Sequence, residues 1–130
     1  MRRISAAVLA AGLAAACGGG GPAAPNPPAD TTPVTIVITG VRGAQSFSPN
    51  PAAVPAGRMV IWKNNDIVVH RVRLTDGSAD TGDLQPGASS APMPLGNISK
   101  PYTCSVHPSM VGSLNAAATP EPPPCTGYCG

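Results

Sequence analysis

The distribution of proline and glycine constrains this chain most, because it leaves only one stretch able to form a packed domain. The 130 residues include 17 prolines and 15 glycines, about a quarter of the sequence, which borders on low-complexity composition. Nine of them lie between 18 and 33, and six lie between 118 and 130. Neither segment can bury enough apolar surface to fold. We therefore expect a single domain over residues 34–117, flanked by a disordered linker at 17–33 and a disordered Pro-rich tail at 118–130.

Composition and charge exclude several classes of function. The formal net charge is +2, and two of the positive charges, Arg2 and Arg3, belong to an N-terminal leader, so the remaining chain is close to neutral. A nucleic-acid-binding protein needs a clustered basic face, and the sequence has none. One Trp, two Tyr and one Phe, together with the lack of a long amphipathic helical window, argue against a helical bundle or a large enzyme. We expect no nucleic-acid partner.

Residues 1–16 read as an export signal, in which Arg2 and Arg3 precede an apolar run from Ile4 to Ala16. This run is shorter than the roughly 20 apolar residues that span a bilayer and is typical of a cleaved signal peptide. The sequence Ala-Ala-Ala-Cys ending at Cys17 resembles the lipobox of bacterial lipoproteins. The resemblance implies that Cys17 is lipidated and anchors the linker at 17–33 to a membrane, in the cell envelope on the periplasmic side. A plain secretory leader, with Cys17 incidental, is the alternative.

Within residues 34–117, three segments have the pattern of strands. Residues 34–39, 59–63 and 68–74 are rich in β-branched residues and are bounded by glycine, asparagine or aspartate, which predicts strands. In the third, alternate residues share one face, so His70 points the same way as its apolar neighbours. A short closing strand is expected at 111–116, and 89–99 is ambiguous because Pro92 and Pro94 disfavour a central strand. Several short strands at this spacing predict an all-β fold, a Greek-key β-sandwich.

Trp62, Arg71 and Arg73 are interpreted as structural residues without a role in binding. Trp62 alternates with Val60 onto one face, which places it in the core. Arg71 and Arg73 share the opposite face from His70, which predicts a solvated strand face.

Residues 102–110 bring three metal-ligand side chains into one loop: Cys104, His107 and Met110, at Cys-x2-His-x2-Met spacing. His70, the other histidine of the chain, faces inward from a strand far upstream. Sulfur ligands favour Cu(I) and imidazole serves both oxidation states, so two His, one Cys and a weak axial Met suit one mononuclear type 1 copper ion. Taken alone, His70 would be a structural histidine and Met110 core filler. Their combination predicts a copper site.

The sequence resembles the cupredoxin family, in particular the small plastocyanin and amicyanin group. The resemblance extends over nearly the whole domain and includes residues 47–49, 54–57, 60–66, His70 and the loop from 102 to 112. It implies a cupredoxin-like β-sandwich in which His70, Cys104 and His107 are equatorial copper ligands and Met110 is the axial one. The residues on either side of His70 differ from the proline and small polar residue that the family commonly has there.

The chain has four cysteines, and an exported compartment favours disulfides. If Cys17 carries a lipid, three remain, so one stays unpaired or bonds outside the chain. A disulfide between Cys125 and Cys129 in the tail would leave Cys104 free for metal. A copper-handling thiol pair is the alternative for Cys125 and Cys129.

These features predict a type 1 (blue) copper electron-transfer protein, tethered to the cell envelope and cycling between Cu(I) and Cu(II). Its expected partners are redox proteins of the envelope, and we expect a monomer. A four-ligand copper lacks the open position that substrate activation needs, so we expect no enzymatic activity. One alternative is a periplasmic copper carrier, a metallochaperone that delivers copper to an oxidase through the same ligands. Another is a metal-free β-sandwich with an adhesive or structural role.

Overall fold

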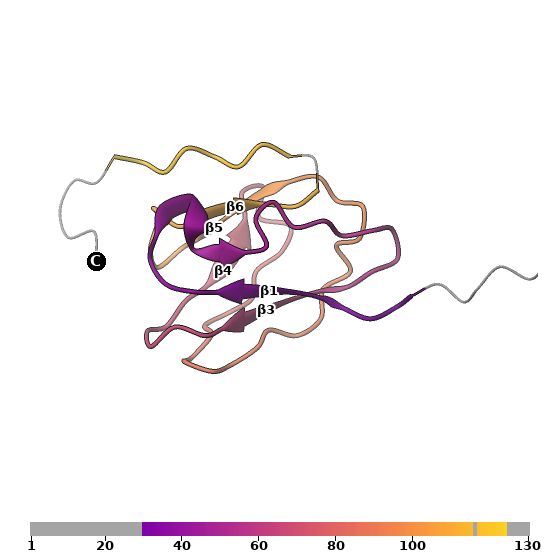
Figure 1. The fold of residues 1–130 in the computed structure, drawn as a ribbon, viewed down its shortest axis with the longest axis horizontal. Coiled ribbons are helices and arrows are strands. Elements are labelled where there is room, and N and C mark those ends of the chain that lie inside the picture. Colours follow the sequence, from indigo (N-terminus) through magenta and orange to yellow (C-terminus); the bar gives the residue numbers. More distant parts are fainter. Residues whose placement is uncertain (1–29, 116, 125–130) are drawn as a thin grey trace, which may run out of the picture.

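The computed structural model describes residues 30–115 and 117–124. Within them the chain forms two three-stranded sheets, of order β2-β1-β3 and β4-β5-β6, and one short 3-10 helix, η1 (Figure 1). The elements are β1 (Val34–Ile38), η1 (Gly43–Gln45), β2 (Phe47–Ser48), β3 (Val60–Asn64), β4 (Val72–Leu74), β5 (Pro101–Cys104) and β6 (Val111–Ser113). The all-β sandwich expected from the sequence is confirmed. No helix in this part of the chain is long and apolar enough to cross a membrane.

The first sheet forms around β1, whose residues are all β-branched. β1 pairs in parallel with β3, with Ile38 opposite Asn64, and antiparallel with the two-residue β2. Alternation along β1 buries Ile36 and Ile38, as a side-chain period of two requires. In β3 the same alternation buries Val60 and Trp62. Because β1 and β3 are parallel, both end at the same end of the domain (Figure 1).

The second sheet has β5 at its centre, antiparallel to both β4 and β6. Cys104 lies opposite Val72 of β4, and Tyr102 lies opposite Gly112 of β6. The turn between β5 and β6 therefore leaves and re-enters the same sheet within a few residues.

An aromatic cluster joins the two sheets. The ring of Tyr102 meets Phe47 edge to face, with centroids 4.9 Å apart, and Trp62 likewise, with centroids 5.5 Å apart, which is a favoured geometry for aromatic pairs. Tyr102 is fully buried, and this burial raises the pKa of its hydroxyl far above the usual value. The ring also covers Gly112, where a Cβ would lie 2.5 Å from two ring carbons. Gly112 thus leaves the space that the Tyr102 ring occupies.

The strand expected at 68–74 is shorter than the sequence predicts. Only residues 72–74 form β4, and His70 joins Leu84 through a single antiparallel bridge. The side chain of Asn64 explains the difference, because its Nδ2 donates to the carbonyls of Val68 and Leu84. These bonds hold residues 65–69 in a compact loop instead of an extended strand.

Two further expectations differ in detail. The strand expected at 111–116 ends at Ser113, because Leu114 leaves β6 to form a bridge with Ala52. The ambiguous segment 89–99 contains no strand, but Ser89 and Met93 each form an isolated bridge to β3. The prolines between and beyond them interrupt a continuous ladder, as expected.

Arg71 and Arg73 lie on the outer side of the second sheet, where the sequence places them, and share one carboxylate. The Nε of Arg71 lies 2.9 Å from Oδ1 of Asp80, and the Nε of Arg73 lies 3.0 Å from Oδ2. The guanidinium of Arg71 is the main cause that holds the pKa of Asp80 below its usual value, although partial burial opposes it. The two arginines are therefore paired as well as solvated.

The segment 117–124 runs back past η1 (Figure 1). The hydroxyls of Ser113 and Thr119 lie 2.8 Å apart, and Pro122 packs close to Gly43. The predicted leader and the proposed lipid site at Cys17 lie outside the described residues. So do Cys125 and Cys129, for which a disulfide is predicted.

Candidate metal centre

Backbone and side-chain hydrogen bonds fix His70. Its N–H donates to the carbonyl of Leu84 at 3.1 Å, and the N–H of Leu84 donates back at 2.7 Å. Asn64 organises the loop before it: Nδ2 donates to the carbonyls of Val68 at 2.8 Å and Leu84 at 2.9 Å, and Oδ1 accepts from the N–H of Asp66 at 2.9 Å. Both Asn64 and His70 are fully buried. The backbone that carries the His70 ring is therefore held by hydrogen bonds within the protein.

The other three predicted ligands come from the last residue of β5, Cys104, and from the turn that joins β5 to β6. The N–H of Cys104 donates to the carbonyl of Met110 at 3.0 Å, and the N–H of Met110 donates to the carbonyl of His107 at 2.9 Å. The N–H of Ser105 donates to the carbonyl of Arg71 at 2.8 Å, which ties the turn to the chain entering β4. The backbone of the turn thus holds the three side chains in a fixed relation to one another and to the second sheet.

Three of the four predicted ligand side chains converge. Sγ of Cys104 lies 3.6 Å from Nδ1 of His70 and 3.8 Å from Nδ1 of His107, and the two Nδ1 atoms are 3.2 Å apart. The three donor atoms all lie within 4.8 Å of one another. Nitrogen and sulfur donors that bind one metal ion at about 2.0–2.3 Å stand about 3.2–3.8 Å apart around it. The observed separations suit a single ion.

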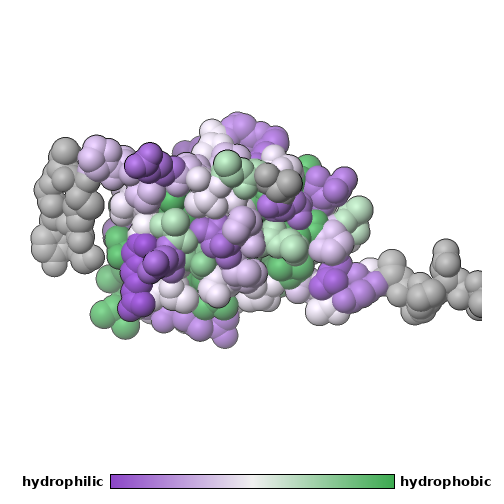
Figure 2. All heavy atoms as spheres, turned by 45° about the horizontal axis from the view of Figure 1, so that its top comes forward, coloured by the Kyte–Doolittle hydropathy of each residue, from purple (hydrophilic) through white to green (hydrophobic). Residues whose placement is uncertain are grey.

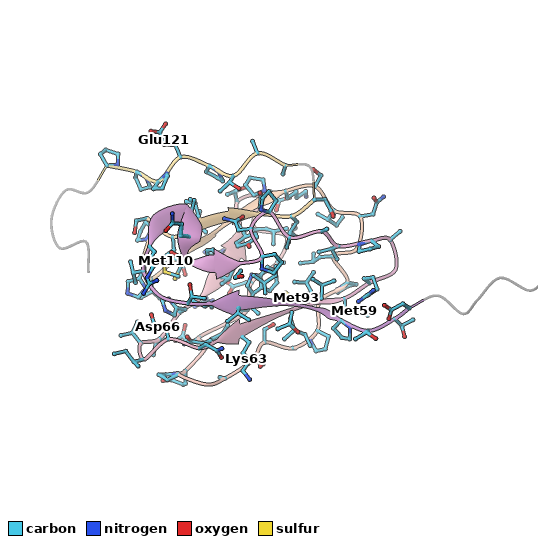
Figure 3. All side chains as sticks on the ribbon, viewed as in Figure 1. Met59, Lys63, Asp66, Met93, Met110 and Glu121 are labelled. Atoms are coloured by element: carbon cyan, nitrogen blue, oxygen red, sulfur yellow. The ribbon has the colours of Figure 1, made fainter. Side chains whose placement is uncertain are left out.

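Met110 completes the predicted set. Its side chain is fully buried, and Figure 3 places it at the same end of the domain as Asp66. Its backbone bonds to Cys104 and His107 keep it in the ligand turn. A thioether is a soft ligand suited to a weak axial position.

The ligands differ in their access to solvent. Cys104 and His70 are fully buried, whereas His107 is partly exposed. Burial and the neighbouring His70 lower the pKa of His107, which favours the neutral imidazole that binds metals. Cys104 is a free cysteine. Cys104 and His70 therefore form the buried part of the site, and the ring of His107 forms its solvent-accessible edge.

Asp66 is the one carboxylate in contact with a ligand among the described residues. Its Oδ2 lies 2.8 Å from Nε2 of His70, and its Oδ1 accepts from the N–H of Ile67 at 2.7 Å. Partial burial would raise the pKa of Asp66, but the hydrogen bonds from His70 and Ile67 lower it overall. An ionised carboxylate only accepts hydrogen bonds, so Nε2 of His70 carries the hydrogen. In the neutral imidazole, the form that binds metals, Nδ1 is then unprotonated, and it faces Cys104.

The donor set and this tautomer fit copper. Imidazole nitrogens with one thiolate and one thioether select copper over harder cations, and the unprotonated Nδ1 of His70 is already directed at the thiol. His70, Cys104, His107 and Met110 form a candidate type 1 copper site for one ion.

The sequence predicted the four candidate ligands but not the residues that hold them. In the sequence, Asn64 and Asp66 look like part of a polar turn, which does not indicate the groups they contact. Only the position of Asp66, four residues before an inward-facing histidine, could have indicated its hydrogen bond with His70.

Comparison with known proteins supports the same class. No protein-family model and no curated protein matches the chain. Among solved structures it is similar to a purple cupredoxin from Nitrosopumilus maritimus, at 27% identity and a TM-score of 0.54, over 62% of this chain and 96% of that one. It is also similar to part of the copper-containing nitrite reductase of Thermus scotoductus SA-01, at 25% identity and a TM-score of 0.53, over 63% of this chain and 21% of that one.

A third neighbour is the Cu(I) form of an amicyanin mutant, at 17% identity and a TM-score of 0.51, over 63% of this chain and 79% of that one; it shares the fold. The sequence resemblance to cupredoxins is thereby confirmed. The chain has the cupredoxin fold and carries a cupredoxin-type set of copper ligands.

Proposed function

We propose that this chain is a type 1 (blue) copper electron-transfer protein of the cell envelope. The observation that carries the proposal is the convergence of two Nδ1 atoms and one thiol sulfur from two separate segments, at 3.2–3.8 Å from one another. When bound there, copper supplies a one-electron couple between Cu(I) and Cu(II). The protein's part is to hold the ligands still, since a site that barely rearranges passes electrons readily.

The rigidity of the ligand positions supports this role. Asn64 and Leu84 hold His70, and backbone bonds close the turn that carries Cys104. The ligands thus come from two segments that hydrogen bonds within the protein hold in place, which supports a site that rearranges little between oxidation states. A copper carrier, in contrast, needs ligands that release the ion to an acceptor.

Exposed apolar side chains lie at the same end of the domain as the site. Ile67, Val68 and Val106 are 87%, 40% and 49% exposed, and they flank His70 and His107 in sequence. Figure 2 shows hydrophobic side chains at the end of the domain where the site lies. A redox partner that docks on this surface comes close to His107, the partly exposed ligand, which we propose as the route for the electron. We propose envelope redox proteins as these partners and a monomeric protein.

The sequence of the leader supports a location in the cell envelope. We propose that residues 1–16 are removed on export and that Cys17 is lipidated, which tethers the domain on the periplasmic side of a membrane through the linker at 17–33. The protein is not an enzyme in this proposal, because four protein ligands leave no position for a substrate.

Visible absorption and EPR spectra after addition of Cu(II) to the domain expressed from Thr32 test the function. An intense thiolate-to-copper band with narrow hyperfine splitting, followed by rapid reversible reduction at an electrode, is the expected result. The variant Cys104→Ala should lose the band, and Ser105→Ala, with a neighbouring side chain outside the donor set, should keep it. A blue Cys104→Ala variant contradicts the assignment.

The same experiment distinguishes the alternatives. Tight Cu(I) binding with slow redox and fast transfer to an acceptor identifies a copper carrier. A correctly folded protein that takes up neither Cu(I) nor Cu(II) leaves the metal-free β-sandwich.

A further inference from the structure

One ligand of the candidate site, His70, is hydrogen-bonded to a carboxylate on the side of its ring away from Cys104. Nε2 of His70 lies 2.8 Å from Oδ2 of Asp66. The imidazole is fully buried and the Asp66 side chain is only 17% exposed, so this hydrogen bond is largely shielded from water. A hydrogen bond of this kind to a charged acceptor is stronger than one between neutral groups.

The carboxylate is itself held in place. Its Oδ1 accepts from the N–H of Ile67 at 2.7 Å, and the N–H of Asp66 donates to Oδ1 of Asn64 at 2.9 Å. Asn64 is fully buried and also binds the carbonyls on both sides of His70, those of Val68 and Leu84. A connected chain of hydrogen bonds therefore runs from the end of β3 through Asp66 to the ring of His70.

This chain of bonds determines which nitrogen of His70 can bind metal. Since the carboxylate accepts the Nε2 hydrogen, Nδ1 of the neutral ring has a free lone pair, and Nδ1 is the atom that faces Cys104 at 3.6 Å and His107 at 3.2 Å. A carboxylate partner also raises the basicity of a metal-binding imidazole. A more basic ligand and a nearby negative charge both stabilise Cu(II) more than Cu(I).

We propose that Asp66 is a positioning residue for the copper centre: it fixes His70 as the Nε2–H tautomer and favours the oxidised ion. The proposal rests on copper binding at this site. Its first part concerns the tautomer of the metal-free protein and can be tested even where copper binding fails.

Three variants separate the possible contributions of Asp66. Asp66→Asn keeps an oxygen that can accept from Nε2 but removes the charge, whereas Asp66→Ala removes both. Asp83→Asn removes an equal charge from a side chain that is 62% exposed and paired with Arg71 at 3.8 Å, so it serves as the control for a general field effect. Far-ultraviolet circular dichroism establishes that each variant is folded.

The first measurement is long-range proton–nitrogen NMR of the histidine rings in the metal-free protein. The wild type and Asp66→Asn should show His70 in the Nε2–H form, and Asp66→Ala should show a mixture of tautomers. A wild-type His70 protonated at Nδ1, or an unchanged tautomer in Asp66→Ala, overturns the positioning role whether or not the protein binds copper.

The second measurement is the affinity for Cu(II) and for Cu(I), and the reduction potential. Loss of a partner hydrogen-bonded to a metal ligand costs about 10- to 100-fold in metal affinity. Asp66→Ala should weaken Cu(II) binding by this factor, and it should weaken Cu(I) binding by a factor about ten times smaller. That tenfold difference corresponds to a rise of about 59 mV in the potential of a one-electron couple, with a smaller rise for Asp66→Asn. Equal shifts in Asp66→Ala and Asp83→Asn, or none in either, overturn the tuning role. A wild type that binds no copper contradicts the proposed function, whereas the NMR result still decides the tautomer.

Discussion

Replacing Gly112 with alanine tests whether the Tyr102 ring packs against Gly112 as closely as the structure indicates. A Cβ at this position would lie 2.5 Å from Cε2 and Cζ of Tyr102 and 2.6 Å from its hydroxyl oxygen. Optimal carbon–carbon contacts are about 3.5–4.0 Å, so either the ring or β6 must move by about 1 Å. The ring has no free space, because it is fully buried between Phe47 and Trp62.

Overpacking of a well-packed core costs about 1–3 kcal/mol. The upper end, about 3 kcal/mol, is expected here because the new methyl group meets two ring carbons and the hydroxyl oxygen of Tyr102, and the ring packs against two other aromatic side chains. In urea, where a small domain loses about 1–3 kcal/mol of stability per molar, this amounts to a fall of about 1–3 M in the midpoint. Tyr102 precedes Cys104 by two residues and Gly112 follows Met110 by two, so the shift should also reach the ligand turn.

Urea unfolding of the metal-free domain, followed by the fluorescence of Trp62, measures the cost. Gly77→Ala is the control, since its φ of +75° carries backbone strain but no atom lies within 4 Å of the new Cβ; it should cost about 1–2 kcal/mol. In a Tyr102→Leu background, which removes the ring, adding Gly112→Ala should cost less than about 1 kcal/mol. If Gly112→Ala costs no more than the control, or costs the same with and without the ring, the steric argument is refuted.

Three other predictions concern the loop, the surface ion pair and the edge of the site. Asn64→Ala removes the stated partner of the Val68 carbonyl and the Asp66 N–H, and one of the two donors to the Leu84 carbonyl. It should destabilise the domain by about 1–3 kcal/mol in urea unfolding; a neutral result contradicts its organising role. The pKa of Asp80 is lowered chiefly by its hydrogen bond with Arg71, so its contribution is complete above the unfolded-state pKa and is lost as pH falls through the folded value. Asp80→Asn should therefore cost less than about 1 kcal/mol at pH 7 and make acid unfolding less steep; an unchanged acid profile would count against the pairing. His107→Gly should lose the charge-transfer band and regain it with added imidazole, because His107 is partly exposed; failure of the rescue in folded protein would place the ring outside the site.

The sequence predicts those parts of the site that depend on local spacing. Cys104, His107 and Met110 lie in one turn, and their separation along the chain is enough to bring them together. His70 was expected to face inward from strand alternation. It does so although residue 70 lies outside β4, because its bridge to Leu84 sets the orientation that a strand would have set.

The parts that depend on contacts between distant segments could not be predicted. The bonds of Asn64 to Val68 and Leu84 require that the loop after β3 contacts the segment near residue 84. The hydrophobic periodicity of the sequence gives no information about that contact. The need for glycine at position 112 likewise depends on the register of β5 and β6, which places Tyr102 opposite it. Local patterns specify what each segment is, whereas tertiary packing decides which polar groups become partners.

Because β1 and β3 are parallel, the chain enters both strands at one end of the domain, and the candidate site lies at the other end. The chain enters β1 beside Met59, since the N–H of Val34 donates to its carbonyl at 2.8 Å, and Arg58 pairs with Asp30 at 2.7 Å. Met59 lies at one end of the domain, and Asp66 and Met110 lie at the other (Figure 3). β1 alone, at about 3.3 Å per residue, spans about 17 Å of that length. A tether attached before β1, as proposed above, would therefore join the domain at the end opposite the candidate copper site and leave that site free for a partner to approach.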